Sequence, residues 1–445
     1  MNKLEFNSPR KLVRMVMSND FWSKLVKNIF ISLWGTGGAN AINLITLLIM
    51  VDMLGNTNYG LFVLAQQYMT IVDSLVNFQS WQGVIKFGSE AVVDKDEGRL
   101  ASIIKYGFTI DIVGAAAGLT VALVAIPIMG RLMQWDSSLI LLAVIFSLEI
   151  VFHIGGTPTG VLRLFNKFNL VAIHSIALAI VRLAAVGIYA LCGNVTLKSF
   201  VILYVCVDIT KHIALLAIAV YIVSKRLGLR NVVKSKLGTA GAGFIRYSLW
   251  SNIGSTADIP IKYFDVFIIS KISVELVSIY KVFKQIIQVF SMLTTPISQA
   301  IMPQLADQIA QKEDRNAYHV VLKIRNIILE VLLPVTVLCG IVAKPCFRVF
   351  LGPEYAQHVI LFIVLLLISD YTLSYVAIHP FFAALGKVRE DFFIILGSNI
   401  VYLIISFLLV NILGIYGIII GTVIQNVLTI SCKTRIINRS LCQPT

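Results

Sequence analysis

The chain has 445 residues, of which 58% are hydrophobic and only 13% are charged, with a formal net charge of +14 and a mean hydropathy of +0.85. Soluble proteins average about 25% charged residues, so this composition excludes an ordinary soluble enzyme or binding domain. The positive charge requires no nucleic acid partner, because the placement of basic residues between hydrophobic segments accounts for it.

Long apolar segments occur along the whole chain. Segments of 18 or more mainly apolar residues are typical of membrane-spanning helices, because about 20 helical residues cross the hydrocarbon core. We therefore predict an all-α integral membrane protein with twelve transmembrane helices. The predicted spans are 28–53, 60–82, 104–130, 137–158, 168–192, 199–223, 246–270, 274–303, 320–344, 356–381, 389–412 and 413–432.

Basic residues between these spans predict the orientation. Most of the 37 Lys and Arg residues lie in the segments on the N-terminal side of the membrane. The opposite loops hold only Arg131, Lys198, Lys271, Lys344 and Arg348. Because cytoplasmic loops are enriched in Lys and Arg, both termini are predicted to be cytoplasmic. The basic N-terminal segment lacks a signal-peptide cleavage pattern, so the first apolar segment is interpreted as an uncleaved anchor.

The spans form two halves of six. We expect an N-terminal cytoplasmic segment at 1–27, helices 1–6 at 28–223, a basic cytoplasmic loop at 224–245, helices 7–12 at 246–432 and a cytoplasmic tail at 433–445. Six spans per half give both halves the same orientation, so two parallel lobes would surround a central cavity. Spans four and ten each carry an acid, a proline and a base at similar spacing: Glu149, Pro158 and Lys167, and Asp370, Pro380 and Arg389.

Four spans carry polar stripes at helical spacing. The stripes comprise Ser32, Thr36, Asn40 and Asn43 on span one; Gln66, Thr70, Asp73 and Asn77 on span two; Ser251, Ser255, Asp258, Lys262 and Asp265 on span seven; and Lys281, Lys284, Gln288, Ser291, Thr295 and Ser298 on span eight. Residues three or four apart share a helix face, and such a face is too costly to leave in lipid. The stripes therefore predict a hydrated cavity.

The stripes also supply candidate substrate-binding residues. These are Lys281, Lys284, Lys262, Asp258, Asn40, Asn43, Asp73, Asn77, Gln288 and Ser255. Lysine ammonium groups bind phosphate as point charges, so the three lysines indicate a cationic site for an anionic head group. Two structural alternatives stay open: Lys262 could pair with Asp258 and Asp265, and Lys281 and Lys284 could extend to the outer interface.

Five further charged residues inside spans have either a coupling or a structural role. They are Glu149, Asp370, Arg182, Asp208 and Lys211. Arg182 and Asp208 lie on consecutive predicted spans, where a structural ion pair is favoured. The single acids could bind a coupling proton or Na⁺, or join helices. Cysteine, histidine and acidic spacings indicate no metal site, and we expect no cofactor.

Enzyme signatures are absent from the sequence. It contains no nucleophile elbow, no phosphate-binding loop and no metalloprotease motif, and its predicted outer loops are short. We therefore expect no catalytic residues and no enzymatic activity.

Several short motifs follow one another along the chain. They are 54–62 (LGNTNYGLF), with the pattern LG-x3-YG, then 86–91 (KFGSEA) and 96–100 (DEGRL), and later 265–269 (DVFII), Tyr280 and Pro303. In this order they resemble the signature, the first inner loop and the later spans of oligosaccharide flippases, the polysaccharide and O-antigen branch of the multidrug/oligosaccharidyl-lipid/polysaccharide exporter superfamily.

The resemblance implies a function and a location. It implies alternating-access transfer of an undecaprenyl-diphosphate-linked oligosaccharide, such as an O-antigen or other surface polysaccharide unit, across the bacterial inner membrane. The implied partners are that lipid-linked oligosaccharide, membrane lipids, and polysaccharide polymerase and chain-length proteins. Spans one and two carry no Lys or Arg, so positive charge would come from Lys262, Lys281 and Lys284, or from Arg182 and Lys211.

Two alternatives stay open. A multidrug or small-solute secondary transporter would use the same stripes to line a smaller site. A membrane polysaccharide polymerase or ligase would share the biosynthetic context, and only the short outer loops argue against it.

Overall fold

The computed structural model of the chain describes residues 20–193, 196–236 and 240–442. All regular structure in these ranges is helical. The first half contains α2 (Asp20–Val76), α3 (Ser80–Val93), α4 (Glu97–Met133), α5 (Ser137–Phe152), α6 (Gly156–Leu164), α7 (Phe168–Leu191), α8 (Leu197–Leu227) and α9 (Leu229–Lys234). The second half contains α10 (Ala240–Thr256), η1 (Pro260–Phe264), α11 (Asp265–Ser270), α12 (Val274–Ala310), α13 (Asp314–Phe350), α14 (Pro353–Gln357), α15 (Val359–Ser374), α16 (Ile378–Ala384), α17 (Val388–Leu413) and α18 (Ile415–Cys442).

The helices account for the hydrophobic pattern. Within the described ranges, nine helical stretches are long and apolar enough to cross a membrane, and one of them, Gly37–Val93, contains two predicted spans. Span seven carries the charged residues Asp258, Lys262 and Asp265, and part of span eight lies outside the described residues; neither is among the nine, yet both are mainly helical. The chain is therefore an all-α multi-pass membrane protein, and every predicted span consists mainly of helical residues.

Some helix boundaries differ from the predicted ones. The predicted loop at 224–245 contains α9 and the adjoining ends of α8 and α10, and most of the predicted tail at 433–445 continues α18. Most of the predicted segment 1–27 lies outside the described residues. Gly55, at φ 71°, separates the two spans within α2, and Gly414, at φ 58°, separates α17 from α18. Glycine suits both sites because it lacks the Cβ that disfavours positive φ.

The repeated proline motifs have the same structural role in both halves. Span four divides into α5 and the short α6, and span ten divides into α15 and the short α16. Pro158 and Pro380 are each the third residue of the short helix. Proline is tolerated in the first helical turn, because the backbone N–H groups there have no partner within the helix.

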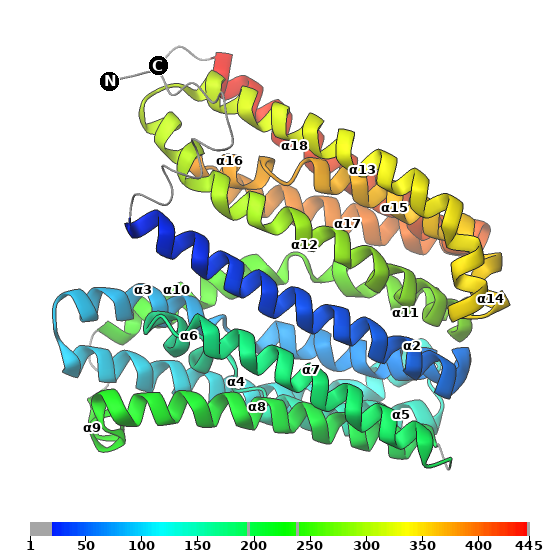
Figure 1. Ribbon diagram of the computed structural model, residues 1–445, viewed down its shortest axis with the longest axis horizontal. Helices are drawn as coiled ribbons and strands as arrows, with labels where there is room; N and C mark the ends of the chain where they lie inside the picture. The colour runs from blue at the N-terminus through cyan, green and yellow to red at the C-terminus, as the bar shows by residue number, and fades with distance from the viewer. Residues whose placement is uncertain (1–19, 194–195, 237–239, 443–445) are drawn as a thin grey trace.

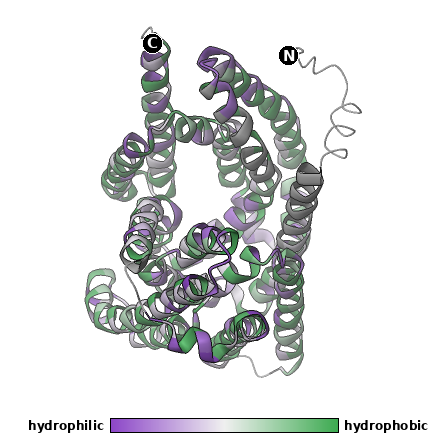
Figure 2. Ribbon diagram, turned by 90° about the vertical axis from the view of Figure 1, so that its left-hand side faces the viewer, coloured by the Kyte–Doolittle hydropathy of each residue, from purple (hydrophilic) through white to green (hydrophobic). Residues whose placement is uncertain are grey.

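Most helices of the first half lie apart from those of the second half, as Figure 1 shows. Helices α3 to α9 lie on one side and α12 to α18 on the other, while α2 runs between them and contacts both α7 and α12. The start of α2 and the end of α18 lie at the same end of the molecule as α9. Figure 2 shows the helices from that end, with hydrophobic residues, in green, along all of them and hydrophilic residues, in purple, interspersed.

At the opposite end, where α14 lies, hydrogen bonds join the Gly55 bend of α2 to the second half (Figure 1). The Asn56 side-chain oxygen accepts bonds from Ser278 (3.2 Å) and Tyr355 (2.6 Å), and its amide donates to Glu354. Thr57 donates to Glu275 at 2.7 Å. These contacts hold α2, α12 and α14 together on the side predicted to face away from the cytoplasm.

Candidate functional site

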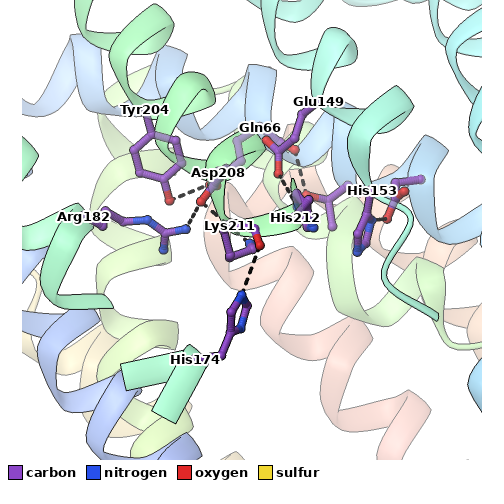
Figure 3. Close-up of polar contacts among 11 residues, drawn as sticks. Gln66, Glu149, His153, His174, Arg182, Tyr204, Asp208, Lys211 and His212 are labelled. Carbon is purple, nitrogen blue, oxygen red and sulfur yellow. Dashed lines mark hydrogen bonds and ion pairs between the residues drawn. The ribbon is translucent and has the colours of Figure 1, made fainter. Parts of the chain in front are cut away.

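A cavity of about 620 Å³ lies within the first half of the chain. Its walls come from α2, α3, α6, α7 and α8, from the link between α2 and α3, and from the break between α5 and α6. Polar and charged side chains in the wall include Asn40, Asn43, Asn77, Gln79, His153, Arg163, His174, Ser175, Arg182, Asp208, Lys211 and His212. Figure 3 shows the central residues, which come from helices far apart in sequence.

Arg182 and Asp208 form the centre of this wall. The Arg182 guanidinium donates to the Asp208 carboxylate and, at 3.3 Å, to the Asn43 side-chain oxygen. Its central carbon also lies 4.9 Å from the centre of the Tyr204 ring. Lys211 Nζ lies 3.7 Å from the same Asp208 carboxylate oxygen, and its side chain is 33% exposed. The Arg182–Asp208 pair predicted from the sequence is therefore present. Because Lys211 shares the same carboxylate, the three side chains together carry a net positive charge.

Three histidines line the adjoining wall (Figure 3). His153 Nδ1 lies 2.7 Å from Asp73 Oδ2, and His212 Nε2 lies 3.3 Å from Glu149 Oε1. The His153 and His212 rings are 4.4 Å apart between centroids. Neither Asp73 nor Glu149 belongs to the cavity lining. Each carboxylate instead contacts a histidine that does line the cavity.

The resulting charge at the cavity surface is positive. Arg163, Arg182 and Lys211 line it, and Asp208 is the one acid among its lining residues. The Arg163 guanidinium stacks on Trp81, with 4.8 Å between its central carbon and the ring centre. Cations concentrated in a partly dehydrated cleft attract anions, and arginine matches the geometry of phosphate oxygens. The arrangement is suited to holding an anionic group.

The lysines of spans seven and eight lie elsewhere, and each has a local partner. Lys262 pairs with Asp258 at 3.1 Å, and Lys284 pairs with the buried Asp265. Tyr280 also donates to Asp265, at 2.9 Å. Lys281 donates to the Gln67 side-chain oxygen at 2.6 Å, across the contact between α12 and α2. None of these three lysines belongs to the lining of the cavity.

Some of the other stripe residues line the cavity, and others do not. Asn40, Asn43 and Asn77 reach the cavity, and Asn40 also donates to Met292 Sδ of α12 at 3.5 Å. Ser255 bonds to the backbone oxygen of Asn252, and Gln288 is exposed. Asp370 is buried and accepts a 2.7 Å bond from Thr336. The side chains of Ser32, Thr36, Thr295 and Ser298 lie outside the described part of the structure.

Several cavity residues were not selected from the sequence: Gln79, Trp81, His153, Arg163, His174 and His212. Arg163 was assigned to a cytoplasmic loop, because span four was expected to end at residue 158, but α6 continues to Leu164. The helical spacing of polar residues on two spans could have identified some of the cavity residues. His174 and Arg182 are eight residues apart on α7, and Asp208 and Lys211 are three apart on α8, which places each pair on one helix face.

Comparison with solved structures identifies the fold. An inward-facing multidrug resistance MATE family transporter of the MOP superfamily aligns over 92% of this chain and 96% of its own, with a TM-score of 0.73 and 14% identity. An outward-facing MATE family transporter gives a TM-score of 0.62 at 12% identity, over 95% and 96%. A MOP superfamily transporter from Pyrococcus furiosus, whose reversed pocket polarity suggests a different function, gives 0.64 at 11% identity, over 94% and 96%. The chain thus has the fold of MOP superfamily transporters.

Sequence comparison identifies the family. The inner membrane protein YghQ of Escherichia coli (strain K12) is 24% identical over 142 residues, which are 31% of this chain and 40% of that protein. The matched segment thus spans about two fifths of that relative. A family described as polysaccharide biosynthesis protein matches residues 25–309, more than half of this chain. The chain therefore belongs to the polysaccharide biosynthesis protein family.

Proposed function

We propose that this protein is a flippase that moves a polyprenyl-diphosphate-linked oligosaccharide of a surface polysaccharide across the bacterial inner membrane. Family membership and the transporter fold support a membrane exporter with a role in polysaccharide synthesis. The observation that carries the choice of substrate is the positive wall of the first-half cavity, formed by Arg163, Arg182 and Lys211 around Asp208.

The charge pattern favours an anionic substrate over a cationic drug. A site for an organic cation would need carboxylates or aromatic faces directed into it. Here Asp208 is shared by two cations, and Asp73 and Glu149 lie behind His153 and His212. A diphosphate would meet Lys211 and Arg163 directly and could compete with Asp208 for Arg182.

The size and chemistry of the cavity fit the polar end of such a lipid. A volume of about 620 Å³ is within the range of pockets that hold drug-sized ligands. It would accept the diphosphate and the first sugars, while the amides of Asn40, Asn43 and Asn77 would hydrogen-bond sugar hydroxyls. The hydrocarbon tail would stay in the bilayer. The better match to an inward-facing than to an outward-facing transporter supports loading from the cytoplasmic side.

Reconstitution of the full chain into liposomes tests the proposal. The liposomes carry a fluorescent polyprenyl-diphosphate oligosaccharide, and a membrane-impermeant reductant quenches the outer-leaflet label. Protein-dependent quenching of inner-leaflet label is expected. Lys211→Gln should slow it by about tenfold, because one charge-assisted phosphate contact contributes about 1.5–3 kcal/mol.

Lys198→Gln is the matched control. Lys198 lies on the same helix, α8, at its exposed first turn and outside the cavity. The control should transport at the wild-type rate. Transport of lipophilic cations without movement of the diphosphate lipid, or equal rates in both variants, would refute the proposal.

A further inference from the structure

A second polar pocket lies in the other half of the chain, between α15 and α18. Its volume is about 570 Å³. Tyr371 of α15 and Tyr375, the residue that follows this helix, form one wall, with ring centroids 5.3 Å apart. The facing wall is a single face of α18 that carries Ile430, Ser431, Thr434, Arg435, Asn438 and Arg439. This pocket shares no residue with the basic cavity of the first half.

Its charge is positive only. Arg435 and Arg439 are one helical turn apart, exposed, and belong to its lining, which contains no acidic residue. Arg325 of α13 adds a third guanidinium beside it. Arg325 donates to the Tyr375 hydroxyl at 3.4 Å, and its central carbon lies 5.7 Å from that ring centre. Asp391, an acid outside the lining, pairs with Lys433.

The depth of the pocket in the bilayer follows from helix geometry. Arg435 comes 20 residues (435 − 415) after Ile415, the first residue of α18, and at 1.5 Å per residue this is about 30 Å, the thickness of the hydrocarbon core. Tyr375 comes 16 residues (375 − 359) after Val359, the start of α15, or about 24 Å. On this measure Tyr375 lies within the hydrocarbon core, and Tyr371, one turn earlier, lies deeper. By contrast, Arg435 lies at the edge of the core, and Arg439, one turn later, lies at the level of lipid phosphates.

The end of α18 that bears these arginines is the one that the positive-inside pattern assigns to the cytoplasm. We propose that the α15–α18 pocket binds the phosphate headgroup of an anionic phospholipid of the inner leaflet. The guanidinium groups of Arg435 and Arg439 would hold the phosphate oxygens, and Ser431, Thr434 and Asn438 would bond the remaining headgroup oxygens. Tyrosine rings at this depth pack against the first carbons of acyl chains. Basic pockets between transmembrane helices on the cytoplasmic side bind such headgroups.

Lipid titration of the purified full chain, followed by native mass spectrometry, tests this site. Phosphatidylglycerol should bind, whereas phosphatidylcholine and inorganic phosphate should bind far more weakly. The double variant R435Q/R439Q should bind phosphatidylglycerol about 25-fold more weakly, equivalent to about 2 kcal/mol for two arginines near the membrane surface. Ser431→Trp, which fills the pocket without changing its charge, should also weaken binding.

The double variant R230Q/R315Q is the matched control, because both arginines are exposed and lie outside the pocket. It should bind phosphatidylglycerol like the wild type. Equal binding of phosphatidylcholine, equal losses in both double variants, or full occupancy by inorganic phosphate would each overturn the lipid site. Preference for a polyprenyl diphosphate over phosphatidylglycerol would also overturn it and would indicate a second substrate position. A negative result here leaves the proposed transport by the first-half cavity untouched.

Discussion

The Tyr355 hydroxyl donates a 2.6 Å hydrogen bond to the side-chain oxygen of Asn56. This bond connects α14 in the second half to the bend of α2 in the first. Tyr355 is fully buried and also contacts Ser278, whereas Asn56 is partly exposed, so the bond is buried at its tyrosine end. If the protein works by alternating access, these contacts must separate when its outer end opens.

Tyr355→Phe should therefore favour the outward-open state. Loss of one buried hydrogen bond of about 1 kcal/mol shifts such an equilibrium about fivefold. A cysteine at the buried Val277 of an otherwise cysteine-free chain reports opening through reaction with an impermeant thiol reagent. Labelling from the outer side should accelerate by about that factor. Tyr371→Phe, remote from these contacts, should leave the rate unchanged, and an unchanged rate in Tyr355→Phe would argue against a role in closure.

Asp208→Asn should destabilise the protein through Arg182. The Arg182 side chain is 16% exposed and that of Asp208 is 6% exposed, so neutralising the acid leaves a guanidinium in a poorly solvated place. We expect a loss of about 2 kcal/mol, less than for a fully buried pair because the adjoining cavity admits water. Thermal midpoints of the purified protein measure the change. The double variant R182Q/D208N should recover part of the loss; if it is less stable than D208N alone, the ion pair is not the cause.

Asn77→Cys tests whether the basic cavity is open to water. Asn77 lines the cavity, whereas Phe146 lies in the apolar core with no exposed surface. In a cysteine-free chain in inverted vesicles, a water-soluble maleimide should label Cys at 77 rapidly and Cys at 146 hardly at all. Equal protection at both positions would mean that the cavity is closed to the cytoplasm.

Gly60→Ala should disturb the contact between α2 and α12. A Cβ at this position would lie 2.2 Å from the carbonyl oxygen of Val274, so the helices would have to move apart. Overpacking of this kind costs about 1–3 kcal/mol. Gly187→Ala, on α7 with nothing within 4 Å of its Cβ, should be neutral or stabilising by up to about 1 kcal/mol. The thermal midpoint should therefore fall in Gly60→Ala and stay unchanged or rise in Gly187→Ala, and similar midpoints would contradict the close packing.

The helices were predictable because the bilayer imposes length and apolarity on each span. The repeated prolines were recognised from the sequence. In the structure Pro158 and Pro380 each lie in the first turn of a short helix that follows a break. The breaks themselves were missed, because the apolar residues continue through them and hydropathy does not record a change of helix.

Charge partners were harder to predict, because pairing depends on helix rotation and neighbour identity. One alternative paired Lys262 with both Asp258 and Asp265; the structure shows the pair with Asp258, whereas Asp265 pairs with Lys284 of α12. Arg182 and Asp208 were paired correctly, since consecutive spans usually pack together. The cavity predicted between the halves, where the stripes would meet, stays a prediction, whereas the basic cavity lies within the first half and is lined by three stripe asparagines.

The break between α5 and α6 has a consequence for permeability. Residues 153–155 leave the regular helix ladder, with the His153 and Ile154 amides bonded to Ile150 and Phe152 instead, and His153 and Gly155 border the basic cavity. Main-chain dipoles at that depth attract water whatever side chains surround them. If the protein moves its substrate through this cavity as proposed, replacing every charged group in the wall would leave the break accessible to water, and leakage of protons or small ions would have to be prevented by closure at either end.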